Sequence, residues 1–242
     1  RIVPIYWIVT SLILFLFFLD PGVIIKRNFT SELISSSYLF YSYLMNDIYP
    51  IIVQGWTLEL EILFYIVFAV SLNFRNLKLV IISAAIILSL ITIFTKQFLL
   101  IEFIFGMLIA YIYNQIKFDK RLGLTLLIIG IFFLFFSIKF NLNTDSFSRI
   151  FFWGIPSALI VIGSVFGRQI NNSILLYLGN ASYSIYLVHL LTIVAFYEFS
   201  SIFLRGYNGD ILAIFCFALS IVSGCFFYSF VEKPIITFFK KK

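Results

Sequence analysis

Charged residues are scarce in this chain: of its 242 residues, 12% are charged and 62% are hydrophobic. Soluble domains carry about 25% charged residues. A chain with so few charges cannot cover a water-facing surface, which excludes an ordinary soluble protein. The composition therefore predicts an integral membrane protein embedded in a lipid bilayer.

Cysteine and histidine are also scarce, with two cysteines and one histidine. Cys216 and Cys225 fall in one apolar segment, at a spacing of about 13 Å on a helix, which is beyond the reach of a disulfide. The sequence has no Cys/His metal cluster, no phosphate-binding glycine loop and no basic–aromatic patch. We therefore expect no metal, no bound cofactor and no nucleic-acid partner.

Long apolar segments fill most of the chain. Eight of them are long enough to span a membrane, at about 20 residues per crossing. The connections between them are mostly short, and we find no internal repeat. We expect an all-α polytopic transmembrane helix bundle, with residues 1–242 forming a single integral-membrane domain. The predicted spans are 2–19, 56–72, 77–94, 98–116, 122–140, 149–166, 181–203 and 210–232.

The long connection 20–55 interrupts this pattern with Asp20-Pro21-Gly22, Lys26-Arg27 and three serines at 35–37. Long loops of this kind tend to carry function, and its second half is predicted to form a short interfacial or re-entrant helix. The chain enters an apolar segment directly after Arg1, without a signal-peptide pattern. We expect it to be part of a larger membrane protein.

Basic residues predict the orientation of the spans. Eleven of the 17 lysines and arginines fall on the same side of the membrane as Arg1. Cytoplasmic loops carry an excess of positive charge. We therefore expect both chain ends to be cytoplasmic, in a bacterial cytoplasmic membrane. The eleven are Arg1, Arg75, Lys78, Lys117, Lys120, Arg121, Arg168, Lys233, Lys240, Lys241 and Lys242.

Two carboxylates lie in the predicted span that begins at Trp56. A carboxylate at the centre of a transmembrane helix costs about 2.5–3.5 kcal/mol on translocon scales. Glu59 lies in the first turn, where the helix dipole favours an anion, and we interpret it as structural. Glu61 lies deeper, on one stripe with Thr57 and Tyr65, and we interpret it as a functional residue.

The one histidine, His189, follows a polar stripe. Ser182, Tyr186 and His189 lie on one helix face, which we expect to point into the bundle. A lone histidine is as often structural as functional, so both interpretations of His189 stay open. Ser182 is too far along the helix to touch it, at about 10 Å of rise.

Three further acids lie inside or beside spans. We interpret Glu102 as a carboxylate near the membrane interface and Glu198 as solvated. Glu232 precedes Lys233-Pro234, which is predicted to end the last helix, and an interfacial charge pair is its simplest interpretation.

Four sequence blocks, in order, resemble the motifs of one family. They are Arg1-Ile2-Val3-Pro4-Ile5-Tyr6-Trp7, the run from Trp56 to Tyr65, the run from Leu178 to His189, and Tyr228-Ser229-Phe230-Val231-Glu232-Lys233-Pro234. Together they resemble the membrane acyltransferase 3 family. Its members move acetyl or other short acyl groups from acyl-CoA onto sugars of polysaccharides and glycosides.

The resemblance implies that the full protein has about ten spans. It also implies that the donor substrate is acyl-CoA, with acetyl-CoA as the first candidate. Arg1 matches an arginine expected to bind the donor's phosphates. The family's essential histidine lies in a first helix upstream, and His189 does not match it. We therefore expect this chain alone to be inactive.

For the full protein, the resemblance implies that a histidine takes a proton from a sugar hydroxyl, which attacks the thioester. Glu61 and His189 are the candidate catalytic residues of this chain. Glu61 would orient or charge-balance the site or position the saccharide acceptor. Trp56, Thr57, Tyr65 and Tyr186 are the candidate substrate-binding or supporting residues.

Two other functions stay open. A non-enzymatic transporter of sugars or lipid-linked glycans would have the same composition, although a transporter is expected to show internal repeats. A protein that binds acyl-CoA or lipid without turnover would also fit. A histidine in the helix upstream of Arg1 would favour the enzyme.

Overall fold

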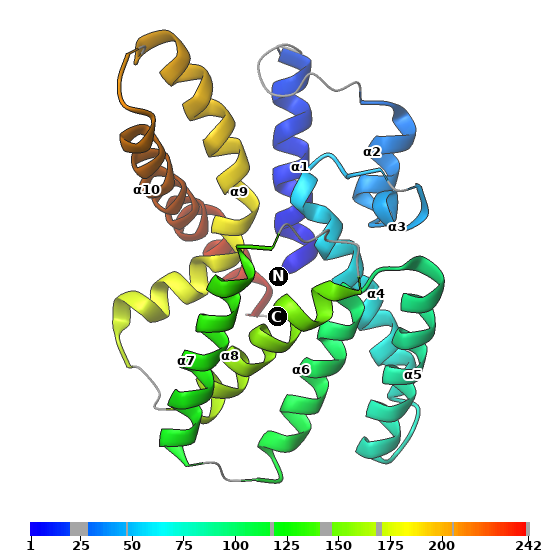
Figure 1. The fold of residues 1–242 in the computed structure, drawn as a ribbon. Coiled ribbons are helices and arrows are strands. Elements are labelled where there is room, and N and C mark those ends of the chain that lie inside the picture. Colours follow the sequence, from blue (N-terminus) through cyan, green and yellow to red (C-terminus); the bar gives the residue numbers. More distant parts are fainter. Residues whose placement is uncertain are drawn as a thin grey trace. The chain divides into compact units, whose positions relative to one another are not determined.

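The computed structural model describes residues 1–19, 29–46, 48–116, 119–140, 147–167, 171–204 and 206–240, and the elements in these ranges are helical (Figure 1). Within these ranges, six helices are long and apolar enough to cross a membrane, and two shorter apolar helices accompany them. The predicted polytopic helix bundle is therefore confirmed. Some residues of the predicted loops lie outside the described ranges, namely Asp20-Pro21-Gly22, Lys26-Arg27, Lys117, Arg168, Arg205, Lys241 and Lys242.

The described residues form two compact units. The first comprises Arg1–Glu59 and Asn171–Lys242, and the second comprises Leu60–Ile170. That the whole chain forms one domain stays a prediction. The first unit contains α1 (Ile2–Leu19), α2 (Ser31–Tyr38), α3 (Ser42–Asn46), η1 (Val53–Gly55), the start of α4 (Trp56–Ser71), α9 (Ser173–Phe203), α10 (Gly209–Phe227), η3 (Tyr228–Glu232) and α11 (Lys233–Lys240).

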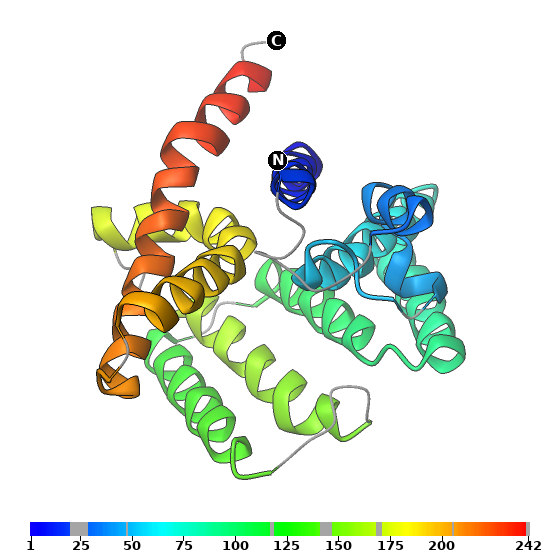
Figure 2. The same cartoon turned by 90° about the horizontal axis from the view of Figure 1, so that it is seen from above.

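In the first unit, α9 packs against α10, and α1 also contacts α9. Figures 1 and 2 show α9 and α10 as neighbours that run in opposite directions. Their close approach depends on Gly224, because a Cβ there would lie 2.5 Å from Ile185 Cα. The Thr192 and Ser223 hydroxyls, 2.7 Å apart, add a hydrogen bond between these two helices.

The second half of the long connection is helical, as predicted. Thr30 caps α2 by accepting a hydrogen bond from the Leu33 amide at 3.2 Å. α2 is tied to α1 because Trp7 Nε1 donates to the Tyr38 carbonyl at 2.9 Å, and the Tyr38 hydroxyl lies 2.6 Å from Ser11 Oγ. These short helices are therefore anchored parts of the first unit.

The second unit packs α7 closely against α8. A Cβ on Gly163 would lie 2.5 Å from the Leu127 amide nitrogen, and one on Gly130 would lie 2.7 Å from the Pro156 carbonyl. Small residues let membrane helices approach at backbone distance. The elements of this unit are the rest of α4, α5 (Leu77–Thr95), α6 (Leu99–Tyr113), α7 (Lys120–Ser137), η2 (Ile150–Gly154) and α8 (Ile155–Phe166).

Two predicted boundaries were wrong. α9 begins at Ser173, eight residues before the predicted span at 181, because Asn172 caps it through hydrogen bonds from the Ile174 and Leu175 amides. The last helix was predicted to end at Lys233-Pro234, but it continues through α11. α10, η3 and α11 follow one another without a break from Gly209 to Lys240, so Pro234 lies inside a continuous helix, directly after the π-helical turn that changes the hydrogen-bond register.

Candidate active site

The candidate site lies in the first unit, along α9. The segment from Asn180 to His189 faces the start of α1, η1 and η3, and its polar groups fall into two clusters. The first cluster is built around Arg1, and the second is built around Tyr186.

The Arg1 cluster centres on a buried carboxylate. Glu232 has no exposed surface, and Arg1 Nε donates to its Oε1 at 2.6 Å. Ser184 Oγ donates to the other oxygen, Oε2. Arg1 Nη2 also donates to the Asn180 carbonyl at 2.6 Å, and the guanidinium lies 5.8 Å from the centre of the Tyr183 ring. A buried charge requires such partners to be tolerated.

A π-helical turn places Glu232 in this cluster. η3, at Tyr228–Glu232, follows α10 directly and changes the helical register at its end. It is held by Tyr177 of α9, whose hydroxyl lies 2.7 Å from Ser229 Oγ and donates to the Cys225 carbonyl at 3.1 Å. Single π-turns inside helices are frequent at functional sites.

The Tyr186 cluster joins η1 to α9. Gln54 Nε2 donates to the Tyr186 and Leu187 carbonyls, each at 3.1 Å. The Tyr186 hydroxyl donates in return to the Gln54 carbonyl at 2.8 Å and lies 2.5 Å from Thr57 Oγ1. These reciprocal bonds fix the start of α4 against the middle of α9.

His189 is fixed through the same carbonyl. Its Nδ1 lies 2.7 Å from the Tyr186 carbonyl oxygen. A carbonyl oxygen only accepts hydrogen bonds, so Nδ1 carries the proton in the neutral ring and Nε2 carries the lone pair. In the described part of the chain no hydrogen bond to Nε2 is found. The imidazole is thus oriented as a base whose accepting atom is Nε2.

Glu59 is a structural carboxylate, in agreement with its interpretation from the sequence. It has no exposed surface and lies in the first turn of α4. It accepts hydrogen bonds from Ser42 Oγ at 2.6 Å and from the Tyr43 and Leu44 amides at 2.9 and 3.1 Å. Its role is therefore to hold α3 against α4.

Glu61 and Tyr65 contact each other, one turn apart on the part of α4 that belongs to the second unit. The Tyr65 hydroxyl donates to Glu61 Oε1 at 2.5 Å. Thr57, the third residue of the predicted stripe, bonds to Tyr186 in the first unit. Trp56 packs on Tyr43, with ring centres 5.3 Å apart. The functional role of Glu61 stays a prediction.

The predicted inward stripe on α9 needs one correction. Ser182 is exposed, whereas Ser184, two residues on, is fully buried. The buried face of α9 therefore passes through Ser184, which shares a carboxylate with Arg1. Glu232 forms a charge pair, as expected, and its partner is Arg1; the carboxylate is buried, and its position at the membrane interface stays a prediction.

The remaining acids and cysteines lie outside the site. Glu198 is exposed, as predicted. Glu102 accepts a hydrogen bond from Arg149 Nε at 3.1 Å, within the second unit. Cys216 and Cys225 are free thiols. In the described ranges, no three His, Cys, Asp or Glu side chains are grouped closely enough to hold a metal ion.

Two apolar cavities lie along α9 in the described part of the first unit. One of about 280 Å³ is lined by Gln54, Leu187 and aliphatic side chains of α1 and α9. A larger one of about 770 Å³ lies between Leu12 and Leu16 of α1 and the later part of α9. The smaller cavity borders the Tyr186 cluster at Gln54, whereas no residue of that cluster lines the larger one.

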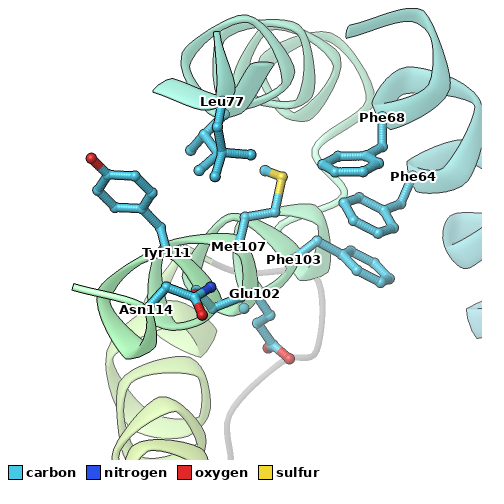
Figure 3. A pocket seen from close by; sticks show the side chains of 11 residues that line it. Phe64, Phe68, Leu77, Glu102, Phe103, Met107, Tyr111 and Asn114 are labelled. Carbon is cyan, nitrogen blue, oxygen red and sulfur yellow. The ribbon is translucent and has the colours of Figure 1, made fainter. Parts of the chain in front are cut away.

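A separate cavity of about 450 Å³ lies in the second unit, between α4, α5 and α6. Figure 3 shows Phe64, Phe68 and Phe103 at one end and Tyr111 and Asn114 at the other. A Cβ on Gly106, in its wall, would meet nothing within 4 Å. This cavity is apolar along most of its length.

Three residues of the site were not selected from the sequence. Gln54 lies two positions before Trp56, and a lone amide before a span gives little signal. Ser184 lies inside the run from Leu178 to His189, where its burial follows only from packing. Glu232 stood in the fourth block, but its partner, Arg1, is 231 residues away.

Comparison with known proteins supports the resemblance. A family model described as an acyltransferase domain matches residues 1–230. The exopolysaccharide production protein ExoZ of Rhizobium meliloti (strain 1021) is 32% identical over 220 residues, covering 78% of this chain. The chain spans 64% of the length of this curated relative. No solved structure matches the chain.

The family match extends from Arg1 of the first cluster to Phe230 inside η3, two residues before Glu232, and includes every residue of the Tyr186 cluster. It covers well over half of the sequence, and the helical architecture is that of a polytopic membrane protein. The chain therefore belongs to the acyltransferase 3 family of membrane proteins.

Proposed function

We propose that the protein transfers an acyl group, acetyl in the first instance, from acyl-CoA to a hydroxyl of an exopolysaccharide or a related saccharide. One observation carries the proposal: the four motif blocks, far apart in sequence, meet on α9 in two adjacent polar clusters. The relationship to an exopolysaccharide production protein supports a saccharide acceptor.

Arg1 is assigned to the donor. Its side chain is 42% exposed although one edge is bonded to Glu232 and Asn180. Guanidinium groups match the geometry of phosphate oxygens, and acyl-CoA carries phosphates. The exposed part of Arg1 therefore holds the donor by its phosphates.

We assign His189 to the acceptor hydroxyl. This assignment is additional to the family histidine, which the resemblance places upstream of Arg1. The hydroxyl oxygen attacks the thioester carbon, and the hydroxyl proton passes to Nε2 of His189. The C–O bond forms as the C–S bond breaks. The proton then passes to the departing CoA thiolate, which leaves the histidine neutral. The hydrogen bonds of the Tyr186 hydroxyl to Thr57 and to the Gln54 carbonyl hold the groups around the His189 imidazole in place.

Glu61 is assigned to the acceptor side of the reaction. Its carboxylate is half-buried and oriented by Tyr65, and it can accept hydrogen bonds from sugar hydroxyls. The orientation predicted from basic residues places this part of α4 toward the outer face. The acceptor would then be modified outside while the donor stays in the cytoplasm.

The test is an acyl-transfer assay in membranes that contain the full-length protein, because this chain alone is expected to be inactive, with radiolabelled acetyl-CoA and purified exopolysaccharide. His189→Asn keeps an N–H donor for the Tyr186 carbonyl but has no basic nitrogen. We expect it to lower kcat by about 10²–10⁴-fold. Tyr197→Phe, at an exposed position of the same helix that lines neither cavity, is the matched control and keeps full activity.

Two results would contradict the proposal. If wild-type membranes transfer no label to any saccharide, with acetyl-CoA or longer acyl-CoA donors, the proposed enzyme activity is contradicted. This result would favour a transporter of sugars or lipid-linked glycans. Full activity of both His189→Asn and Glu61→Gln in folded protein would remove the assigned residues.

A further inference from the structure

Glu232 belongs to no step assigned above, although it is one of the two acids without exposed surface in the described ranges. The other, Glu59, is accounted for by its bonds to α3. Glu232 instead faces a cation and a hydroxyl, each on one of its two oxygens. A carboxylate placed between two such partners fixes the position of both.

The contacts of Arg1 show what is fixed. A guanidinium has five N–H donors in one plane. Nε is bonded to Glu232 and one Nη2 hydrogen to the Asn180 carbonyl, so the edge formed by these two nitrogens is filled. The end formed by Nη1 and Nη2 has no hydrogen-bond partner among the described residues. This planar fork can bind two oxygens of one phosphate.

We infer that Glu232, held by Ser184 and by the π-turn η3, is a positioning residue that aims the Arg1 fork at a phosphate group of the acyl-CoA donor. The inference rests on the proposed function and assigns a residue that acts through Arg1 without touching substrate. It also explains the π-turn, because η3 ends at Glu232 and Tyr177 holds it through Ser229.

Orientation and charge have opposite effects on donor binding. Glu232→Gln removes a negative charge beside Arg1, so simple electrostatics would strengthen the binding of an anion. Loss of the charge-assisted bond frees the guanidinium to rotate, which weakens bidentate binding. If Glu232 is a positioning residue, the second effect dominates, and the KM for acyl-CoA rises.

We expect Glu232→Gln to raise the KM for acetyl-CoA about tenfold or more, as expected for the loss of a hydrogen bond to a charged group. The kcat stays near that of the wild type, and kinetics with S-acetyl-pantetheine, which lacks phosphates, do not change. Dephospho-acetyl-CoA keeps the pyrophosphate and lacks the 3′-phosphate, so its response shows which of the two Arg1 holds.

Ser184→Ala provides a second variant if Glu232→Gln folds poorly, because it removes one bond to the carboxylate and keeps the ion pair. It should raise the same KM by a smaller factor. Ser182→Ala, two residues away and exposed, is the matched control and leaves both kinetic constants unchanged.

A binding readout separates this inference from the proposed function. CoA should raise the melting temperature of the detergent-solubilised wild type more than that of Glu232→Gln, while pantetheine affects both equally. This comparison needs no turnover, so it holds even if no acceptor is found. The inference is overturned if Glu232→Gln binds CoA as well as the wild type does. It is also overturned if the substitution raises the KM for the phosphate-free donor as much as the KM for the phosphate-bearing donor.

Discussion

Gln54 connects two parts of the sequence that are 132 residues apart. Its amide donates to two successive carbonyls of α9, and one of these carbonyls also receives His189 Nδ1. Only 8% of Gln54 is exposed, so water cannot replace these bonds. At the scale of single residues, the orientation of His189 therefore depends on a side chain outside its own helix.

Replacing the amide nitrogen tests this dependence. Gln54→Glu places a carboxylate oxygen against the Tyr186 and Leu187 carbonyls, so two acceptors face an acceptor. We expect the stability to fall by about 2–4 kcal/mol, because buried polar groups lose their partners. Thermal unfolding in detergent measures the loss. Gln115→Glu, at an exposed position, should change it little, and equal stability of both variants would contradict the account.

Glycines decide how closely the helices pack. α7 and α8 approach at backbone distance because Gly163 has no Cβ, whereas Gly106 of α6 faces open space in the second-unit cavity. Both glycines lie inside helices, where alanine is intrinsically the better residue by about 0.8–1.0 kcal/mol. Packing alone therefore determines the sign of a glycine-to-alanine change.

We expect Gly163→Ala to destabilise the protein by about 1–3 kcal/mol through overpacking against α7. Gly106→Ala should stabilise it by up to about 1 kcal/mol through helix propensity. Melting temperatures of the two variants in the same detergent provide the comparison. A stabilising Gly163→Ala would show that α7 and α8 are not in backbone contact.

Apolarity and length predicted the helices well, because a span needs only an uninterrupted apolar run. The prediction failed where other forces decide. The start of α9 follows from the Asn172 cap, and the continuation through Pro234 follows from the preceding π-turn. For the site, the sequence supplied Arg1, Thr57, Tyr186 and His189. The sequence did not predict the contacts of Gln54, Ser184 and Glu232, because their hydrogen-bond partners lie far away in the chain.

At the scale of the whole molecule, the orientation in the membrane stays a prediction from basic residues. It can be tested in a variant without the native Cys216 and Cys225. A membrane-impermeant maleimide added to intact cells should label Tyr207→Cys and spare Arg75→Cys. Both positions are exposed. The reverse pattern would invert the orientation and place Arg1 on the side without cytoplasmic CoA.

The single membrane domain predicted from the sequence is a second claim at this scale. α4 runs without a break from the first unit into the second. If the chain is one domain, thermal unfolding monitored by Trp7 and Trp56 of the first unit and by Trp153 of the second should give one transition. Two separated transitions would show two domains.

The division of work between the two clusters is tested most directly by steady-state kinetics with both substrates varied. Arg1→Gln keeps hydrogen-bonding capacity but loses the charged fork, so the account predicts a higher KM for acyl-CoA with the KM for saccharide unchanged. His189→Asn should lower kcat with both KM values near those of the wild type. If Arg1→Gln lowers only kcat, the assignment of the Arg1 cluster to donor binding is contradicted. If His189→Asn changes only the KM for acyl-CoA, the assignment of the Tyr186 cluster to proton transfer is contradicted.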